Sequence, residues 1–289
     1  MIRNKIGARL LFAVSCLALA AVVQAQDLEK LPYVPTPQIV VDEMLKMAGV
    51  NANDLVIDLG SGDGRLIVTA ARNFKANGIG VDIDAKLVEL ATRNARNEGV
   101  GDRAKFLEQD MFKADISKAS VITLYVLPDF MERLRPKLLR ELKPGARIVA
   151  HDYYMSDWHP DRFAELTVPE KKAANGTEKA YLYLWTVPAV VQGDWRINWD
   201  FGPGKLPVIA LAFNQRYQMI NASAANGDGA MEIVNSTLKG DDIDFFLTIG
   251  ANKYRFSGKI QGDRMSGNAV TGAGGKPIPW SATKIAPEK

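Results

Sequence analysis

The stretch Leu55–Arg65 reads LVIDLGSGDGR, an apolar run that leads into Asp58 and is followed by three glycines at alternate positions. The unbroken apolar run predicts a buried parallel strand, and the glycines predict a tight turn that opens a helix. Asp58 falls at the carboxyl end of this strand, where ligands bind in doubly wound sheets. The backbone at Gly60, Gly62 and Gly64 can approach such a ligand closely.

The glycine spacing indicates the kind of ligand. A dinucleotide-binding turn reads G-x-G-x-x-G, which would need glycine at position 65, where this chain has Arg65. The pattern here is D-x-G-x-G-x-G. A carboxylate at the strand end repels phosphate and suits a ligand that carries a cation and hydroxyl groups, such as S-adenosylmethionine.

The segment from Asp58 to Gly64 resembles motif I of the class I S-adenosylmethionine-dependent methyltransferases. The resemblance implies a doubly wound, Rossmann-like α/β sheet that binds S-adenosyl-L-methionine at Gly60, Ser61, Gly62 and Asp63. The alternative interpretation is a glycine-rich turn in some other α/β protein.

The first 25 residues have the composition of a signal peptide. Arg3, Lys5 and Arg9 come without any acid, the residues from 10 to 23 are almost wholly apolar, and Ala25 ends a short cleavage pattern. We therefore expect cleavage after Ala25 and an exported chain, periplasmic or secreted. The alternatives are an uncleaved segment that anchors the chain in a membrane and a mitochondrial transit peptide.

Without residues 1–25 the chain has no net charge and no cysteine. The formal charge of the whole sequence is +3, and this segment holds three of its 36 basic residues and none of its 33 acids, so 33 of each sign remain. This balance gives no reason to expect a nucleic-acid partner. Because Cys16 leaves with the segment, the mature chain has no disulfide and no cysteine metal site.

The mature chain divides into two parts. Strand and helix patterns alternate from about residue 37 to 150, which predicts a parallel sheet covered on both faces. From about residue 190 apolar and polar residues alternate, and turn signals recur at short intervals. We expect an S-adenosylmethionine-binding methyltransferase domain over residues 26–189. A small all-β antiparallel domain of unknown role, a sandwich or open barrel, follows over 190–289.

Local signals also predict individual elements of the first domain. Thr36 and Pro37 are typical of the N-cap and first residue of a helix. Residues 121–127 form a continuous apolar run that predicts one strand. Residues 130–142 have helical spacing that Pro136 interrupts, and residues 181–187 predict another strand of the sheet.

Further acids extend the predicted cofactor site. Asp82 and the adjacent Ile83 end the second strand, 24 residues after Asp58, where a carboxylate can accept both ribose hydroxyls. Asp110 follows the third strand and is placed to accept the adenine amino group, with Met111 beside the ring. Taken singly, Asp82 could be a turn residue and Asp110 a helix cap, but two acids at neighbouring strand ends favour a cofactor site.

The leader over residues 26–36 and the helix after it resemble the segment that closes over the cofactor in these methyltransferases. This resemblance places Tyr33 and Thr36 at the cofactor.

A narrower resemblance covers about residues 31–160. The sequences at 32–37 and 123–128, together with His151-Asp152, are similar to the lysine methyltransferases that include the enzyme for the ATP synthase c subunit. Many methyltransferases acting on nitrogen have Asn/Asp-Pro-Pro-aromatic where this chain has TLYVLP. The resemblance implies methyl transfer to a lysine amine of a protein partner.

Transfer from a sulfonium to an amine needs the nitrogen deprotonated and in line, which positioning and desolvation can supply. We expect the backbone carbonyls of Leu127 and Pro128 to hold the amine hydrogens. Tyr125 and Tyr33 can offer π faces to the ammonium that forms. For both tyrosines the alternative is ordinary core packing.

Both histidines lie in one loop, which begins at His151-Asp152 and includes His159. We expect His151 or Asp152 to relay a proton or to orient the acceptor. Plain packing at the strand end is the alternative. The spacing of the histidines and nearby acids matches no familiar ligand pattern, so no metal site is predicted.

Three functions follow from this sequence. The first is an exported or membrane-tethered methyltransferase that acts on protein lysine, although export would carry it away from cytoplasmic S-adenosylmethionine. The second is a methyltransferase for a small molecule or another acceptor. The third is a non-catalytic exported binding module that retains the fold.

Overall fold

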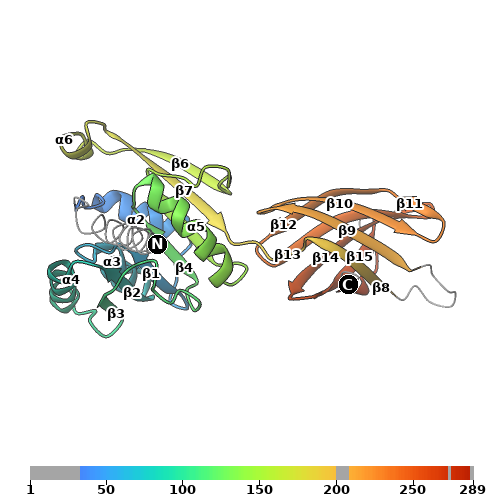
Figure 1. The fold of residues 1–289 in the computed structure, drawn as a ribbon, viewed down its shortest axis with the longest axis horizontal. Coiled ribbons are helices and arrows are strands. Elements are labelled where there is room, and N and C mark those ends of the chain that lie inside the picture. The colour runs from blue at the N-terminus through green and yellow to red at the C-terminus, as the bar shows by residue number, and fades with distance from the viewer. Residues whose placement is uncertain (1–32, 200–207, 273–274, 287–289) are drawn as a thin grey trace, which may run out of the picture.

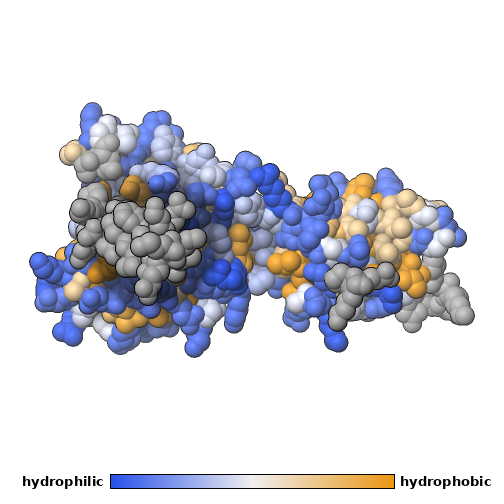
Figure 2. All heavy atoms as spheres, in the orientation of Figure 1, coloured by the Kyte–Doolittle hydropathy of each residue, from blue (hydrophilic) through white to orange (hydrophobic). Residues whose placement is uncertain are grey.

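The computed structural model describes residues 33–199, 208–272 and 275–286. The predicted signal peptide, residues 1–25, lies outside these ranges. The chain forms an α/β lobe followed by an all-β lobe (Figure 1). On the face shown in Figure 2 the α/β lobe is mainly hydrophilic, and apolar side chains gather over part of the all-β lobe. None of the helices in the described residues is long and apolar enough to cross a membrane.

A seven-stranded sheet organises the first lobe, in the order β3-β2-β1-β4-β5-β7-β6. Its strands are β1 (Leu55–Leu59), β2 (Asn77–Asp82), β3 (Ala104–Glu108), β4 (Val121–Leu124), β5 (Arg147–His151), β6 (Arg162–Thr167) and β7 (Lys179–Thr186). β1 is parallel to both β2 and β4, whereas β7 is antiparallel to β5 and β6. The strand order reverses between β1 and β4, so the glycine-rich turn after β1 lies at the switch point of the sheet.

Helices cover both faces of this sheet because its central strands are apolar on both sides. The helices are α2 (Gln38–Met47), α3 (Arg65–Phe74), α4 (Ala85–Asn97), α5 (Pro128–Glu141) and the short α6 (Lys171–Asn175). Val56 of β1 packs in one core with α2 and α3, while Ile57 and Leu59 pack in the other with α5. The doubly covered α/β sheet predicted from the sequence is confirmed.

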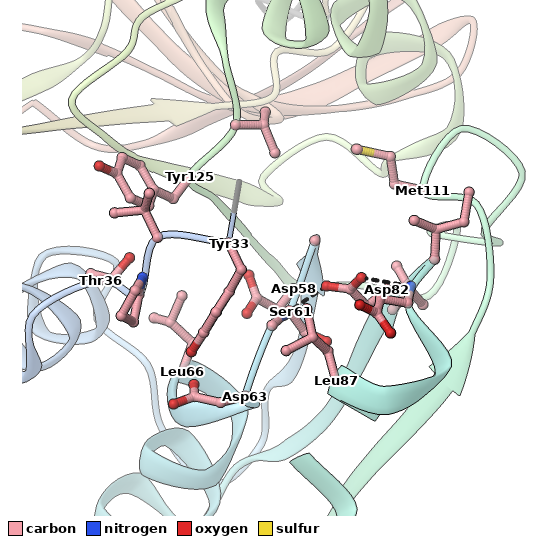
Figure 3. A pocket seen from close by; sticks show the side chains of 18 of the residues that line it. Tyr33, Thr36, Asp58, Ser61, Asp63, Leu66, Asp82, Leu87, Met111 and Tyr125 are labelled. Atoms are coloured by element: carbon pink, nitrogen blue, oxygen red, sulfur yellow. Dashed lines mark hydrogen bonds between the residues drawn. The ribbon is translucent and has the colours of Figure 1, made fainter. Parts of the chain in front are cut away.

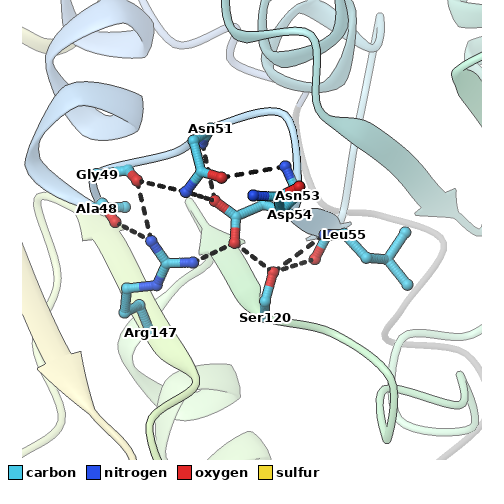
Figure 4. Close-up of polar contacts among 8 residues, drawn as sticks. All are labelled: Ala48, Gly49, Asn51, Asn53, Asp54, Leu55, Ser120 and Arg147. Carbon is cyan, nitrogen blue, oxygen red and sulfur yellow. Dashed lines mark hydrogen bonds and ion pairs between the residues drawn. The ribbon is translucent and has the colours of Figure 1, made fainter.

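A polar network connects the amino-terminal ends of several strands, at the side of the sheet away from the glycine-rich turn. Figure 4 shows its hydrogen bonds and ion pairs. Asp54, which precedes β1, is buried and pairs with the guanidinium of Arg147 at the start of β5. Asp54 also accepts the Ser120 hydroxyl at 2.7 Å and the Asn51 backbone N–H at 2.8 Å. Arg147 donates in addition to the carbonyl of Ala48 at 2.7 Å. The network therefore joins the end of α2 to the starts of β1, β4 and β5.

The second lobe is a nine-stranded antiparallel sheet in the order β11-β10-β9-β8-β16-β15-β14-β13-β12. Its strands are β8 (Gly193–Trp199), β9 (Ile209–Arg216), β10 (Met219–Asn226), β11 (Gly229–Met231), β12 (Ile233–Lys239), β13 (Asp242–Ile249), β14 (Asn252–Gln261), β15 (Arg264–Thr271) and β16 (Ile278–Lys284). The sheet curls until it is nearly closed around a core that includes Trp195, Phe245, Phe256 and Trp280. The predicted all-β antiparallel lobe is confirmed.

Two predicted element ends are wrong by a few residues. The expected strand over 121–127 stops at Leu124, which pairs with Leu59, the last residue of β1. Beyond Leu59 the partner strand turns away, so the following apolar residues have no ladder to join. Pro37, not Thr36, is the N-cap of α2, and its carbonyl accepts the Val40 and Val41 N–H groups at 3.0 Å each.

Pro136 does not interrupt α5, which runs unbroken from Pro128 to Glu141. A proline inside a helix costs about 3 kcal/mol. Burial of Met131, Leu134 and Leu138 against the sheet offsets this cost, because most of the stability of a protein helix comes from packing. The sequence signal at Pro136 is therefore overruled by the tertiary structure.

Candidate active site

A cavity of about 730 Å³ opens at the carboxyl ends of β1, β2 and β4, a size typical of small-molecule sites. Thirteen predicted site residues line it: Tyr33, Thr36, Asp58, Gly60, Ser61, Gly62, Asp63, Asp82, Ile83, Asp110, Met111, Tyr125 and Leu127. In Figure 3 Asp82 and Met111 lie at one end, and Thr36 and Tyr125 at the other. Three predicted residues, Pro128, His151 and Asp152, are not part of the lining.

The glycine-rich turn is fixed to the end of β2. The N–H groups of Gly60 and Ser61 both donate to the carbonyl of Val81 at 2.9 Å. Gly62 has a φ of 53°, and a Cβ there would lie 2.5 Å from the ring of Tyr33. Only glycine fits this position, because the backbone is left-handed and the leader packs directly on it.

Asp82 is held by the turn that it faces. Its Oδ2 accepts the Gly62 N–H at 2.8 Å, and its Oδ1 accepts the Asp84 N–H at 3.0 Å. A carboxylate has about four acceptor positions, so each oxygen can still accept a further hydrogen bond. Asp82 is therefore suited to a pair of vicinal hydroxyl groups in the cavity.

Asp58 is almost wholly buried at the end of β1, with 2% of its surface exposed. Burial raises the pKa of its carboxyl to about 7, and the nearby charges of Asp82 and Asp63 act in the same direction. A hydrogen bond of 2.6 Å from the Thr123 hydroxyl opposes the rise. A cation bound in the cavity would stabilise the carboxylate, so the site favours positively charged ligands.

The leader is attached to the turn through Arg65, a role that was not predicted from the sequence. Arg65 pairs with Asp63 through Nη2 and Oδ2 at 2.6 Å and donates from Nη1 to the Thr36 carbonyl at 2.8 Å. Tyr33 lies over Gly62, and its pKa is raised to about 12, chiefly by desolvation and also by Asp63. The sequence signal for this ion pair was the short spacing of Asp63 and Arg65, two residues apart.

The wall opposite Asp82 is aromatic. The ring of Tyr125 stacks on His151 at 4.0 Å between centroids, and on Tyr153 at 6.2 Å with an interplanar angle of 16°. Tyr153 lines the cavity and was not predicted as a site residue. The carbonyl of Leu127 accepts the N–H groups of Phe130 and Met131 at 2.9 and 3.1 Å, because it begins α5.

His151 lies behind Tyr125 and is completely buried. Burial lowers its pKa to about 4, so the imidazole is neutral at pH 7. Its Nδ1 is 3.4 Å from the Thr36 hydroxyl. Asp152 is bonded to the buried amine of Lys171 and accepts the Tyr181 N–H at 3.1 Å. The buried His151 and the Asp152–Lys171 pair therefore support the aromatic wall on the side away from the cavity. A proton relay through His151 or Asp152 stays a prediction.

The end of the cavity near Asp82, away from the aromatic wall, has both apolar and polar lining residues. Ile83 and Met111 supply apolar surface there, and Asp110 uses Oδ1 to accept the Phe112 N–H at 2.9 Å. The hydroxyl of Ser61 is buried and has no hydrogen-bond partner within the described residues. An unpaired buried hydroxyl costs free energy, so it is suited to bind a ligand atom.

These features fit S-adenosyl-L-methionine. Asp82 can accept two hydroxyl groups, Asp58 can face a cation, and Ser61 has an unused hydroxyl. Among the residues that the structure describes, no group of three or more His, Cys, Asp and Glu residues could hold a metal ion.

Known proteins resemble the α/β lobe. The sequence pattern of the ANTKMT methyltransferase domain matches residues 58–162. A protein-lysine N-methyltransferase of Saccharolobus islandicus is 40% identical over 154 residues, which are 53% of this chain and 92% of that protein. The Homo sapiens lysine N-methyltransferase of the ATP synthase c subunit is 35% identical over 152 residues, which are 52% of this chain and 64% of that enzyme.

Solved structures also resemble the α/β lobe. The crystal structure of an RNA methyltransferase from Salinibacter ruber, in complex with S-adenosyl-L-homocysteine, shares 44% identity and has a TM-score of 0.50. The match covers 55% of this chain and 96% of that one. The ligand in this relative agrees with the cavity residues described above.

Proposed function

Since this chain belongs to the S-adenosylmethionine-dependent methyltransferases, we propose that it transfers a methyl group to the amine of a protein lysine. One observation carries the proposal: two acids suited to the cofactor and a stacked aromatic wall face each other across one cavity. The lysine acceptor is supported by the relatives from Saccharolobus islandicus and Homo sapiens, whose names give lysine as their target.

The residues that would hold the cofactor are those at the ends of β1, β2 and β3. Asp82 would accept hydroxyl groups, Asp58 would face positive charge, and Ile83 and Met111 would cover an aromatic ring. When bound, S-adenosyl-L-methionine supplies a methyl group on a sulfonium, which an amine can attack.

The residues of the aromatic wall, at the end of the cavity away from Asp82, would bind the lysine amine and favour its neutral form. Tyr125, Leu127 and Tyr153 surround it with apolar and aromatic surface, which excludes water and lowers the pKa of a lysine that enters. The neutral amine is the nucleophile, so this environment favours attack. The aromatic faces also suit the cationic product.

We further propose that residues 1–25 direct export or membrane attachment. Their composition supports this location, and their basic and apolar blocks have the order of a signal peptide. A fusion of residues 1–30 to a reporter that is active only in the periplasm tests the proposal. An active reporter is expected, and a silent one would indicate a cytoplasmic enzyme.

The direct test of function has two steps. Calorimetric titration of residues 26–289 with S-adenosylmethionine and S-adenosylhomocysteine should give micromolar binding of both. The same protein is then incubated with methyl-labelled cofactor and cell fractions, and label is sought in methyllysine after acid hydrolysis of protein. A parallel RNA fraction is the comparison, because the relative from Salinibacter ruber is named an RNA methyltransferase.

The outcomes separate the functions. Label in methyllysine supports the proposal. Label found only in RNA, or only in a small molecule, would show that this class of molecule, and not protein lysine, is the methyl acceptor. Cofactor binding without transfer to any fraction would favour the binding module. The balanced charge of residues 26–289 gives no reason to expect RNA, since a strongly basic composition is typical of domains that bind it.

A further inference from the structure

The β9–β10 hairpin of the all-β lobe reaches the loop that borders the acceptor end of the cavity. β9 ends at Arg216 and β10 starts at Met219, and these two residues pair, so Tyr217 and Gln218 form a two-residue turn. This turn contacts residues 157–161, which lie in the loop between β5 and β6. The two lobes therefore meet next to an element of the site.

Trp158 is the centre of this contact. It is completely buried, and the Tyr217 ring stacks on it at 5.4 Å with an interplanar angle of 14°. Its indole Nε1 donates to Gln218 Oε1 at 2.9 Å, and Gln218 Nε2 donates to the His159 carbonyl at 2.7 Å. The hairpin thus supplies one apolar and one polar partner to this part of the loop, in addition to Trp185 of β7, whose ring lies 6.1 Å from that of Trp158.

Asp157, the preceding residue, joins three elements. It accepts Arg216 Nη2 at 2.7 Å, the Tyr217 hydroxyl at 3.0 Å and Arg135 Nη1, from α5, at 2.6 Å. The pKa of Asp157 is lowered, chiefly by the hydrogen bond from Arg216. Hairpin, loop and α5 are therefore connected at one carboxylate.

The backbone of Tyr217 is strained. Its φ is 55°, in the left-handed region that glycine and asparagine adopt most easily. A bulky residue in this conformation is unfavourable, and such outliers concentrate at functional positions. A turn that only connected β9 to β10 would have no need of an aromatic residue at this place.

The same loop carries Tyr153 into the cavity. At its start, Asp152 has a φ of 63° and is bonded to the buried Lys171. Near its end, the Trp158 carbonyl accepts Trp185 Nε1 at 2.7 Å. The loop is therefore held at its start by Lys171, and near its end both by Trp185 of β7 and by the hairpin. Tyr153 lies between these two points.

We propose that the β9–β10 hairpin is a positioning element of the acceptor end. Tyr217 and Gln218 hold residues 157–161 in place, and the loop in turn holds Tyr153 against Tyr125. Only the description of this end as the acceptor end rests on the proposed function. The all-β lobe thereby helps to shape one end of the cavity.

The test compares hydrogen exchange in variants of the full chain. The double variant Tyr217→Asn/Gln218→Ala removes the stack and the side-chain hydrogen bonds, while asparagine tolerates the left-handed backbone. Amides of residues 153–161 should exchange at least about tenfold faster. Exchange in β1 and β2, and affinity for S-adenosylhomocysteine, should stay within about twofold, because the hairpin does not touch that part of the cavity.

Two control variants define the effect. Tyr217→Phe keeps the ring and loses only the hydroxyl bond to Asp157, so it should restore most of the protection. Asp228→Ala changes another turn of the same lobe, where the backbone N–H of Asp228 bonds to Asn226, and should leave the loop unchanged.

Unchanged exchange in residues 153–161 of the double variant would overturn the proposal. Faster exchange throughout the α/β lobe would overturn it as well, since the hairpin would then stabilise the whole lobe. Neither result depends on methyl transfer, so a failure to methylate lysine would be distinguishable. With a methylated acceptor in hand, the double variant should raise its KM at least about threefold, without a matching loss of affinity for S-adenosylhomocysteine.

Discussion

The hydroxyl of Thr123 donates a hydrogen bond of 2.6 Å to Oδ1 of Asp58, and both side chains are buried at the carboxyl edge of the sheet. The two residues face each other across the β1–β4 pair, where the strand order reverses. This bond holds in place a carboxylate whose burial is unfavourable until a cation binds. The site is therefore organised at some cost in stability, and several measurements can detect this.

Replacement Asp58→Asn should stabilise the ligand-free protein and weaken cofactor binding. Asparagine keeps an acceptor for Thr123 but carries no buried charge, so at pH 8 the free energy of unfolding should rise by about 1–3 kcal/mol. Affinity for S-adenosylmethionine should fall at least about tenfold. Urea denaturation and calorimetry measure the two quantities, and a variant that binds as tightly as the wild type would contradict the assigned role.

The pH dependence of stability should contain two opposing contributions. The pKa of Asp58 rises from 3.8 to about 7 on folding, so its contribution to stability falls as pH increases between these values. The pKa of His151 falls from 6.5 to about 4, so its contribution rises with pH over that range. The two slopes offset each other between about pH 4 and 6.5.

Variants separate these slopes. In the Asp58→Asn variant the contribution of His151 remains, so the free energy of unfolding should increase with pH from about 4 to 6.5. In the His151→Gln variant the contribution of Asp58 remains, so the free energy of unfolding should decrease from about pH 4 to 7. Differences from the wild type, taken from urea denaturation at several pH values, remove the contributions of other groups. Parallel curves for wild type and either variant would show that the corresponding residue titrates normally.

Asp82→Ala should weaken binding of S-adenosylmethionine by about 2 kcal/mol or more, because charge-assisted hydrogen bonds to the ligand are lost. Asp82→Asn keeps an acceptor for the Gly62 N–H and separates loss of charge from loosening of the turn. The matched control is Asp102→Ala, since that carboxylate is 76% exposed. An affinity for the cofactor unchanged by Asp82→Ala would remove Asp82 from the site.

Arg147→Ala should lower the free energy of unfolding by about 2–4 kcal/mol and leave the cofactor affinity of the folded protein unchanged. The substitution leaves the buried Asp54 without its cation and removes donors from the carbonyls of Ala48 and Gly49. These groups lie at the starts of β1, β4 and β5, whereas the cavity opens at the carboxyl ends of the strands. Arg103→Ala, at a more exposed position, is the control, and equal effects of both variants would show that the network contributes little.

Much of the cofactor end could be predicted from the sequence. The turn from Gly60 to Gly64 and the acids Asp58 and Asp82 lie directly at the ends of apolar strands, so short segments define their place. The acceptor end was harder to predict. Tyr153 follows β5 in an irregular loop, and no periodic pattern marks the direction of its side chain.

The sequence by itself determined the parallel strands of the α/β sheet, the all-β lobe after it and the ligand-binding turn, because each depends on residues that are close along the chain. It did not show that β6 and β7 join this sheet antiparallel. The tertiary structure decided which distant groups meet. It brought Lys171 to Asp152 and Tyr217 to Trp158, and it buried His151 behind Tyr125. Such contacts depend on the packing of whole elements and on the burial of charge, which local spacing does not encode.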